Sequence, residues 1–275
     1  MKLKKILSNF RKEKKSIIAF NLQNLYQLEA AVLITEELQL PMIIQFSERY
    51  LRFLNNKHGI QYIINKFSNK FIYYHLDHCI DLEFIKFCID SGFDSVMYDG
   101  SSFDIEVNIK NTKTIIDYAR SSGCLVEGEL GKVSGVEDGF GDAGSSYADI
   151  KEIKKYVDET QIDLLALGIG NAHGFYNSLD ALKTEIIRDA SLMLNSNQLF
   201  VLHGATGLSD EIINEVIGYG VVKINISTQL KLLYIDLLKS YVSNNNLYNE
   251  ISFSNFMNTN LSEFFKKLIN KYTKK

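Results

Sequence analysis

The stretch LFVLHGATGLSDEIINEVIGYGVVKINI (residues 199–226) carries the pattern that decides the fold. Its first four residues are uninterrupted apolar residues, as in a strand that is buried on both faces. A glycine-containing segment follows, and Ser209 or Asp210 then stands where the N-cap of a helix is expected, before apolar residues at helical spacing. A second apolar run ends the stretch, so the sequence predicts a strand–helix–strand unit of a parallel sheet.

The same alternation extends along the rest of the chain. Strands are predicted at Ile17–Phe20, Met42–Phe46, Phe71–Tyr74, Ser95–Tyr98, Leu125–Leu130, Leu164–Leu167, Leu199–Leu202 and Val222–Ile226. Helices are predicted at Leu25–Leu38, Asp81–Ser91, Asp104–Ser121, Asp149–Val157 and Asp210–Ile217, besides a short N-terminal helix and a C-terminal tail helix over roughly Asn258–Tyr272. Eight strands that are each followed by a helix predict one α/β domain, a (β/α)8 TIM barrel spanning residues 1–275.

Composition and charge exclude several other classes of protein. The 275 residues are 46% hydrophobic and 23% charged with a net charge of −3, which is ordinary globular composition without a sign of nucleic-acid binding. No apolar window is long enough to span a bilayer, and the basic N-terminus lacks the apolar run of a signal peptide. Cys79, Cys88 and Cys124 show no paired spacing, so we expect reduced thiols and a cytoplasmic location.

Polar residues gather at the predicted C-terminal ends of the strands. In strand order they are Asn21; Ser47 and Glu48; His75, Asp77 and His78; Asp99; Glu127 and Glu129; His173; His203; and Asn225, Ser227 and Thr228. Two long connections, Gly131–Ser146 and Gly168–Asp180, leave the same face, and loops of that length are usually functional or mobile. Because the active site of this type of barrel lies at the C-terminal face, we expect a functional site there.

Histidines indicate what kind of site it is. Three of the five, His78, His173 and His203, lie at the ends of different predicted strands. Neutral imidazoles from separate elements, with a fourth coordination position left for substrate, make a catalytic zinc site. His75 lies two residues before Asp77 on the same face of an extended chain, and it is equally explained as an oriented polar core residue.

The segments that follow the last two strands predict a phosphate site. His203-Gly204-Ala205-Thr206-Gly207 follows one strand, and Asn225-Ile226-Ser227-Thr228 ends the other. The corresponding loops of such barrels commonly bind phosphate through backbone N–H groups and a helix N-terminus. The glycine pair alone is more typical of a plain turn, but together with the Ser/Thr-rich end of the last strand it favours phosphate.

Several segments, taken in order, resemble the class II fructose- and tagatose-bisphosphate aldolases. They are FNLQNL (20–25), QFSE (45–48), HLDH (75–78), SVMYDGSS (95–102), VEGELGKVSGVEDG (126–139), GIGNAHGFY (168–176), LHGATG (202–207) and KINIST (223–228). The resemblance covers most of the chain. It implies zinc-dependent, reversible cleavage of a ketose 1,6-bisphosphate to dihydroxyacetone phosphate and glyceraldehyde 3-phosphate.

The resemblance also implies roles for individual residues. Zinc would be bound by His78, His173 and His203. Glu129 would be an alternative ligand, and Asp99 an acidic residue near the metal. The candidate catalytic residues are Asp77, the acid/base at the hydroxyl involved in bond cleavage, and Glu137, which would move the proton at the carbanion carbon. The candidate substrate-binding residues are Asn21, Ser47, Gly174, Gly204, Thr206, Asn225, Ser227 and Thr228. Family members often bind a monovalent cation, Na⁺ or K⁺, near the phosphate, and they are usually homodimers or homotetramers.

The chain departs from the family pattern at several positions. Arg49 replaces a common glycine, Ser102-Phe103-Asp104 replaces a common His-x-Pro, Cys79 replaces a glycine or histidine, and Asn258 stands where some relatives have an arginine that contacts the distal phosphate. None of these changes removes a candidate ligand or acid/base residue. They leave open whether the substrate is fructose bisphosphate, tagatose bisphosphate or another phosphorylated ketose.

Other functions of the same barrel are less consistent with these residues. A non-catalytic aldolase-like barrel would be expected to lose the metal ligands and the acid/base pair, which this chain retains. Zinc hydrolases on this fold often carry H-x-H on an early strand, whereas His75 and His78 have a different spacing. A class I aldolase needs a Schiff-base lysine, and Lys223, the one lysine predicted in a strand near the site, is interpreted as structural or charge-balancing.

Overall fold

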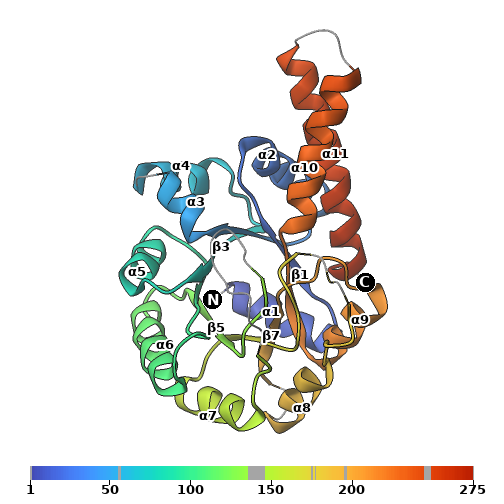
Figure 1. Ribbon diagram of the computed structural model, residues 1–275. Helices are drawn as coiled ribbons and strands as arrows, with labels where there is room; N and C mark the ends of the chain where they lie inside the picture. Colours follow the sequence, from blue (N-terminus) through green and yellow to red (C-terminus); the bar gives the residue numbers. More distant parts are fainter. Residues whose placement is uncertain are drawn as a thin grey trace.

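The computed structural model describes residues 2–54, 57–135, 146–174, 176, 178–194, 197–244 and 249–274. Its centre is a closed barrel in which parallel strands follow one another in chain order and β8 pairs with β1 (Figure 1). The strands are β1 (Ile17–Asn21), β2 (Met42–Ser47), β3 (Ile72–Cys79), β4 (Ser95–Tyr98), β5 (Leu125–Leu130), β6 (Leu164–Leu167), β7 (Leu199–Leu202) and β8 (Val221–Ile226). The predicted (β/α)8 barrel is therefore confirmed.

Most of the helices surround the barrel on its outer side, whereas α1 lies across one end of it (Figure 1). The helices are α1 (Lys2–Glu13), α2 (Leu25–Leu38), α3 (Glu48–Phe53), α4 (Lys57–Lys66), α5 (Leu82–Asp90), α6 (Ile105–Ala119), α7 (Ile150–Thr160), α8 (Glu185–Met193), α9 (Asp210–Tyr219), α10 (Thr228–Asn244) and α11 (Glu250–Tyr272). Asp81, Asp149 and Ser209 cap α5, α7 and α9, since their side-chain oxygens accept hydrogen bonds from backbone N–H groups of the first turn. Asp104 stands at the N-cap of α6 without a side-chain hydrogen bond to the helix.

Strand β3 differs most from its predicted bounds. We expected it to end at Tyr74, but it continues to Cys79 and carries His75, Asp77 and His78 within it. A run of polar residues normally marks the end of a buried strand. Here those side chains lie inside the barrel, where they are hydrogen-bonded to polar side chains of β1, of β4 and of the segment after β7, and the strand continues.

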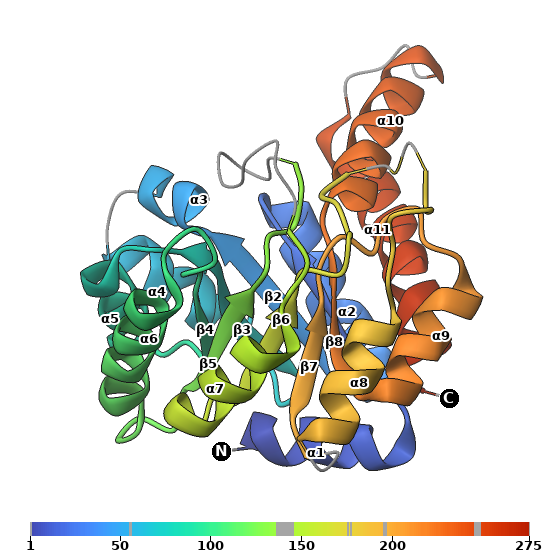
Figure 2. The same cartoon turned by 60° about the horizontal axis from the view of Figure 1, so that its bottom comes forward.

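The N-terminal end of the barrel is closed by α1, which lies across it (Figure 2). Leu3 and Leu7 of this helix are buried in an apolar cluster with inward-facing residues of the barrel. Those residues are Ile17, Ala19, Ile43, Tyr73, Leu125, Leu164, Ala166, Leu199, Val201 and Val222. This end of the barrel is thus a packed apolar core, and the polar interior residues lie towards the other end.

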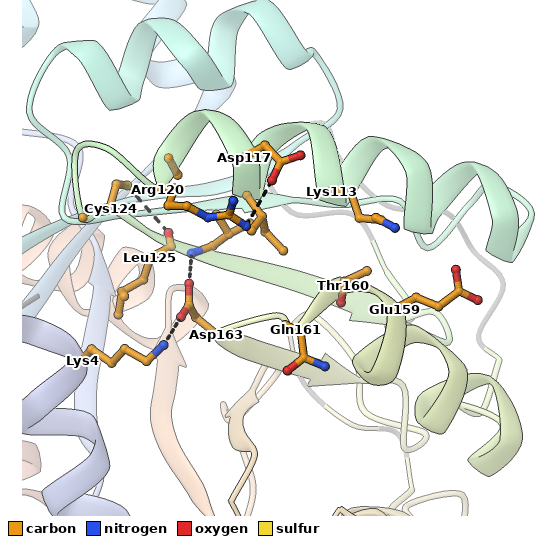
Figure 3. Close-up of a pocket in the computed structure, with 14 residues that line it drawn as sticks. Lys4, Lys113, Asp117, Arg120, Cys124, Leu125, Glu159, Thr160, Gln161 and Asp163 are labelled. Atoms are coloured by element: carbon orange, nitrogen blue, oxygen red, sulfur yellow. Dashed lines mark hydrogen bonds and ion pairs between the residues drawn. The ribbon is translucent and has the colours of Figure 1, made fainter.

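A groove of about 440 Å³ opens beside α6 and α7 at the N-terminal end of β5 (Figure 3). Its charged residues are largely paired with one another. Lys4 Nζ lies 2.5 Å from Asp163 Oδ1, and Arg120 Nη2 lies 3.2 Å from Asp117 Oδ1. The first pair joins α1 to the segment before β6, and Asp163 Oδ2 also accepts from the Val126 N–H of β5 over 3.1 Å, so we interpret these lining residues as structural.

Helices α10 and α11 form a hairpin that extends beyond the C-terminal face of the barrel (Figures 1 and 2). The second half of α11 packs against α2 and β1, with the Phe265 ring centroid 4.6 Å from that of Phe20. None of the helices in the described part of the chain combines the length and the apolarity needed to cross a membrane.

Candidate metal centre and active site

Three histidines from distant parts of the chain meet at the C-terminal end of the barrel. His78 lies on β3, His173 in the connection after β6, and His203 directly after β7. One ring nitrogen of each lies within 4.8 Å of the others. The ring centroid of His78 is 4.7 Å from that of His203 and 5.3 Å from that of His173. The residues predicted to form a metal site are therefore brought together.

An irregularity in β3 lets two consecutive side chains reach the site. The pairing of β3 with β4 shifts register between Leu76 and Cys79, and His78 has a left-handed backbone with φ of 40°. Consecutive side chains of a regular strand point to opposite faces, and a bulge interrupts that alternation. As a result, Asp77 contacts Asn21 of β1 while the neighbouring His78 contacts His203.

The connection after β6 is fixed to both neighbouring loops. The His173 backbone N–H donates to the Ser134 carbonyl over 2.8 Å, and the Asn171 side-chain amide donates to the His203 carbonyl over 3.0 Å. Gly204 has φ of 67°, and a Cβ at this position would lie 2.3 Å from the Ala172 carbonyl oxygen. Only glycine therefore allows the loop after β7 to pass this close to the segment that carries His173.

Carboxylates orient two of the three rings. Asp99 Oδ2 lies 2.8 Å from His78 Nδ1, and Glu127 Oε1 lies 2.8 Å from His203 Nε2. The remaining nitrogens, His78 Nε2 and His203 Nδ1, face each other at 3.0 Å. A histidine that binds metal through one nitrogen commonly bonds a carboxylate through the other, so this arrangement fits a metal ion between the rings.

The charge around the rings also fits a cation. Burial alone lowers the pKa of His78, but the surrounding carboxylates, chiefly Asp77 and Asp99, raise it well above its usual value. Glu129 is buried, its Oε2 atom has no hydrogen-bond partner, and burial together with Asp99 raises its pKa well above the usual value. With His78 and Asp99, Glu129 forms a second group whose candidate ligand atoms lie within 4.8 Å of one another. Such a carboxylate would be stabilised by a bound divalent cation.

Asp77 is held by amide groups from three other strands. Its Oδ2 atom accepts from Asn21 Nδ2 at 2.8 Å and from Gln45 Nε2 at 3.3 Å, and its Oδ1 atom accepts from Asn225 Nδ2 at 3.3 Å. Only 2% of Asp77 is exposed. The carboxylate is therefore fixed in orientation beside the three histidines, as an acid/base residue must be.

The residues predicted to bind phosphate lie next to this centre. Ser227 Oγ and Asn225 Oδ1 are buried without a hydrogen-bond partner, and α10 begins at Thr228 directly afterwards. Thr206 is buried in the loop after β7. Gly174 has φ of 97°, and a Cβ at this position would meet nothing within 4 Å. The Ser227 hydroxyl beside a helix N-terminus is suited to binding an anion, whereas Asn225 Oδ1 can only accept a hydrogen bond, for example from a hydroxyl group.

The remaining residues that the sequence analysis named lie in different parts of the structure. Ser47 ends β2 opposite Asp77, where its Oγ atom accepts from the Tyr50 N–H and so caps α3. Glu137 lies outside the described residues. Asn258, on α11, donates to Glu29 of α2 over 3.3 Å, and Arg49 is exposed. Gln45 is a contact of Asp77 that the sequence analysis did not single out, although it belongs to the QFSE segment.

Sequence comparisons agree with this geometry. The family model described as "Fructose-bisphosphate aldolase class-II" matches residues 1–275. A 6-phospho-5-dehydro-2-deoxy-D-gluconate aldolase of Shouchella clausii (strain KSM-K16) is 33% identical over 240 residues, which cover 86% of this chain and 81% of that protein. A fructose-bisphosphate aldolase of Ureaplasma parvum serovar 3 (strain ATCC 700970) is 33% identical over 246 residues, which cover 87% of this chain and 83% of that protein.

Solved structures share the whole fold. The YdjI aldolase of Escherichia coli K12 superposes with a TM-score of 0.81 at 26% identity, over 98% of this chain and 96% of that one. Fructose-bisphosphate aldolase of Campylobacter jejuni superposes with a TM-score of 0.82 at 19% identity, over 98% of this chain and 93% of that one, which shows a common fold. With the family match over the full length, these likenesses show that the chain is a lyase that belongs to the class II fructose-bisphosphate aldolase family.

Proposed function

We propose that this enzyme binds zinc through His78, His173 and His203 and cleaves a phosphorylated ketose, releasing dihydroxyacetone phosphate. The observation that carries the proposal is the meeting of the three ring nitrogens within 4.8 Å of one another. Ligand sets of neutral imidazoles suit zinc among the common divalent metals. Zinc bound there would supply a Lewis acid that polarises the ketone carbonyl and favours negative charge on the adjacent carbon during cleavage.

Asp77 is our candidate for the proton transfer that accompanies bond cleavage. Its carboxylate would take the proton from the hydroxyl on the carbon that becomes the aldehyde. The electron pair of that O–H bond then forms the new carbonyl, and the pair of the broken C–C bond stays on the carbon beside the ketone. Asn21, Gln45 and Asn225 would keep the carboxylate in one orientation during this transfer. The family resemblance assigns the later protonation of that carbon to Glu137.

The ends of β7 and β8 would hold the phosphate of the ketone half. Ser227 Oγ provides a buried hydroxyl that can donate to the phosphate, and the N-terminus of α10 provides backbone N–H groups. Fructose bisphosphate and 6-phospho-5-dehydro-2-deoxy-D-gluconate, which the names of the relatives contain, both carry a phosphate on the carbon next to the ketone. That shared half supports dihydroxyacetone phosphate as the common product.

The second half of the substrate distinguishes two candidate functions. Fructose- or tagatose-1,6-bisphosphate would place a second phosphate at the far end, whereas 6-phospho-5-dehydro-2-deoxy-D-gluconate would place a carboxylate there. The latter is favoured by Asn258, a neutral residue that contacts Glu29 where the family resemblance expects an arginine for the distal phosphate. A monovalent cation near the phosphate, assembly as a homodimer or homotetramer, and a cytoplasmic location stay predictions.

The test is release of triose phosphate by metal-free and zinc-loaded protein. Purified protein is stripped with a chelator, reloaded with zinc and incubated with each of the three candidate substrates, and dihydroxyacetone phosphate is measured by a coupled reductase assay. We expect release from at least one substrate with zinc and no release without it. Fructose 6-phosphate, which lacks the phosphate next to the ketone, is the matched control and should not be cleaved. Full activity in excess chelator would contradict the metal assignment, and no release by zinc-loaded protein would contradict the activity.

A further inference from the structure

A buried ionic network lies directly beneath the three histidines. Lys223 on β8 donates from Nζ to Glu127 Oε2 over 2.7 Å and lies 3.1 Å from His75 Nε2. His75 Nδ1 lies 2.8 Å from the hydroxyl oxygen of Ser95. Lys223, Glu127 and His75 are all 0% exposed. The network therefore links β3, β4, β5 and β8 across the interior of the barrel, without access to water.

This network is in direct contact with one of the three histidines. Glu127 uses Oε2 for Lys223 and Oε1 for His203 Nε2, at 2.8 Å. A carboxylate only accepts hydrogen bonds, so His203 must carry its proton on Nε2 to make this contact. Its Nδ1 atom is then left with a lone pair, and this atom faces His78 Nε2 at 3.0 Å.

The opposite tautomer has a partner available as well. Asn225 Nδ2 lies 3.2 Å from His203 Nε2 and could donate to it if that nitrogen carried no proton. The same amide also donates to Asp77, and its distance to the ring is longer than that of Glu127. The Lys223 ammonium group keeps Glu127 ionised and therefore able only to accept. It thus favours the His203 tautomer that is protonated on Nε2 and can bind metal through Nδ1.

Packing alone does not explain why the network is there. Burying an ion pair costs several kcal/mol of desolvation per ion, and apolar replacements of similar volume are often as stable or more stable. The neighbouring layer of the same barrel is filled by apolar side chains such as Leu164, Val201 and Val222. An apolar group could thus occupy the position of Lys223, as far as filling the core is concerned.

We propose that Lys223 and Glu127 are positioning residues that fix the ring orientation and tautomer of His203 for metal binding, with His75 and Ser95 holding the lysine. The inference rests on the proposed metal site. It extends that site by a layer that contacts neither metal nor substrate. Partners of this kind typically change metal affinity by about 10–100-fold when they are removed.

The experiment compares metal binding by wild-type protein and a double variant, Lys223→Met with Glu127→Gln. This pair keeps the side-chain volumes and leaves no unpaired buried charge, so it avoids the 3–5 kcal/mol that removal of one partner of a buried ion pair costs. The matched control is Ser16→Ala, which removes a buried hydrogen bond to the Val221 carbonyl at the opposite end of the barrel. Near-ultraviolet circular dichroism confirms the fold, and titration against a competing chelator gives the zinc dissociation constant.

We expect the dissociation constant to rise at least tenfold in the double variant and to stay within twofold of the wild type in Ser16→Ala. A folded double variant with wild-type zinc affinity would overturn the inference. Wild-type protein that binds no zinc would instead overturn the proposed function. A second measurement needs no variant: ¹⁵N chemical shifts of His203 in metal-free wild-type protein should show a protonated Nε2 and an unprotonated Nδ1, and the reverse tautomer would also overturn the inference.

Discussion

His78 shows how a single backbone conformation shapes this site. A non-glycine residue in the left-handed region carries a cost of about 1–3 kcal/mol, which the surrounding structure must offset. The 2.8 Å contact with Asp99 and the shift in pairing between β3 and β4 hold His78 in this conformation with φ of 40°. The consequence is that a candidate acid/base residue and a candidate metal ligand stand next to each other in the sequence and in the same site.

Replacement of Asp77 and replacement of Glu137 should block different partial reactions. Asp77→Ala should lower the rate of cleavage by about 10²–10⁴-fold, because it removes the group that acts on the substrate hydroxyl. The same variant should still exchange the proton of dihydroxyacetone phosphate with solvent. Glu137→Ala should lose that exchange together with turnover. Deuterium incorporation into dihydroxyacetone phosphate, followed by NMR, measures the exchange.

Asp104→Ala serves as the control for both variants. Asp104 stands at the N-cap position of α6 without a side-chain hydrogen bond to the helix, so its loss should leave cleavage and exchange unchanged. Normal exchange by the Glu137→Ala protein would show that Glu137 is an ordinary loop residue. Loss of exchange in Asp77→Ala would show that the two steps are not divided between the two acids.

At the scale of elements, the junction of β8 and α10 is the part we assign to phosphate. Ser227→Ala removes a buried hydroxyl that has no protein partner, so the folded protein should lose little stability. A hydrogen bond to a charged group contributes about 1.5–3 kcal/mol, which corresponds to a rise in KM of roughly 10–100-fold. Steady-state kinetics with the phosphorylated ketose, beside zinc titration, would separate this effect from metal loss. Ser209→Ala, which removes a helix cap on α9, should leave KM unchanged, and an unchanged KM in Ser227→Ala would favour the plain-turn interpretation.

The bounds of a helix or strand are predicted best where the whole element packs against the barrel. β4, β5, β6 and β7 have their predicted bounds. β6 and β7 are uninterrupted apolar runs, whereas β5 also contains Glu127 and Glu129, whose side chains are buried.

α11 begins at Glu250, before the predicted Asn258. Its first turns pack on α10 as well as on α2, since the rings of Phe253 and Phe256 lie 5.0 Å and 5.3 Å from that of Tyr241 and the ring of Phe253 lies 5.3 Å from that of Tyr26. The strand–helix repeat contains no such helical hairpin, so the repeat does not predict where α11 begins.

The sequence could predict those residues of the site that lie at the ends of strands. His78, His173 and His203 could be grouped because strand ends of a barrel meet at one face. The contact of Lys223 with Glu127 and His75 could not, because β3, β5 and β8 are not neighbours in the barrel. Such contacts depend on how the strands tilt and which residues share a layer across the interior. A lysine in an apolar run was the one available signal, and it indicated a structural or charge-balancing role, without naming Glu127 or His75 as its partners.

At the scale of the whole molecule, the N-terminal end of the barrel is apolar, and we assign catalysis to the C-terminal end. α1 covers the apolar N-terminal end of the barrel (Figure 2), while the buried polar residues of the candidate site lie at the other end. In barrels of this type, residues at the N-terminal end generally serve stability and residues at the C-terminal end serve catalysis. Changes at the α1 end should therefore affect folding without changing the affinity for metal.

Leu7→Ala tests this separation. Leu7 is fully buried between α1 and the barrel, and the loss of such a side chain costs about 2–5 kcal/mol, depending on how far the surrounding residues close the cavity. Leu192→Ala is the matched control, because Leu192 is 68% exposed and its loss should change the free energy of unfolding by less than about 0.5 kcal/mol. Urea denaturation measures both values, and zinc titration of the folded proteins should give the wild-type dissociation constant. If Leu7→Ala weakens zinc binding while the protein remains folded, the two ends of the barrel are coupled, because the apolar cluster then also helps to set the positions of the strands that carry the histidines.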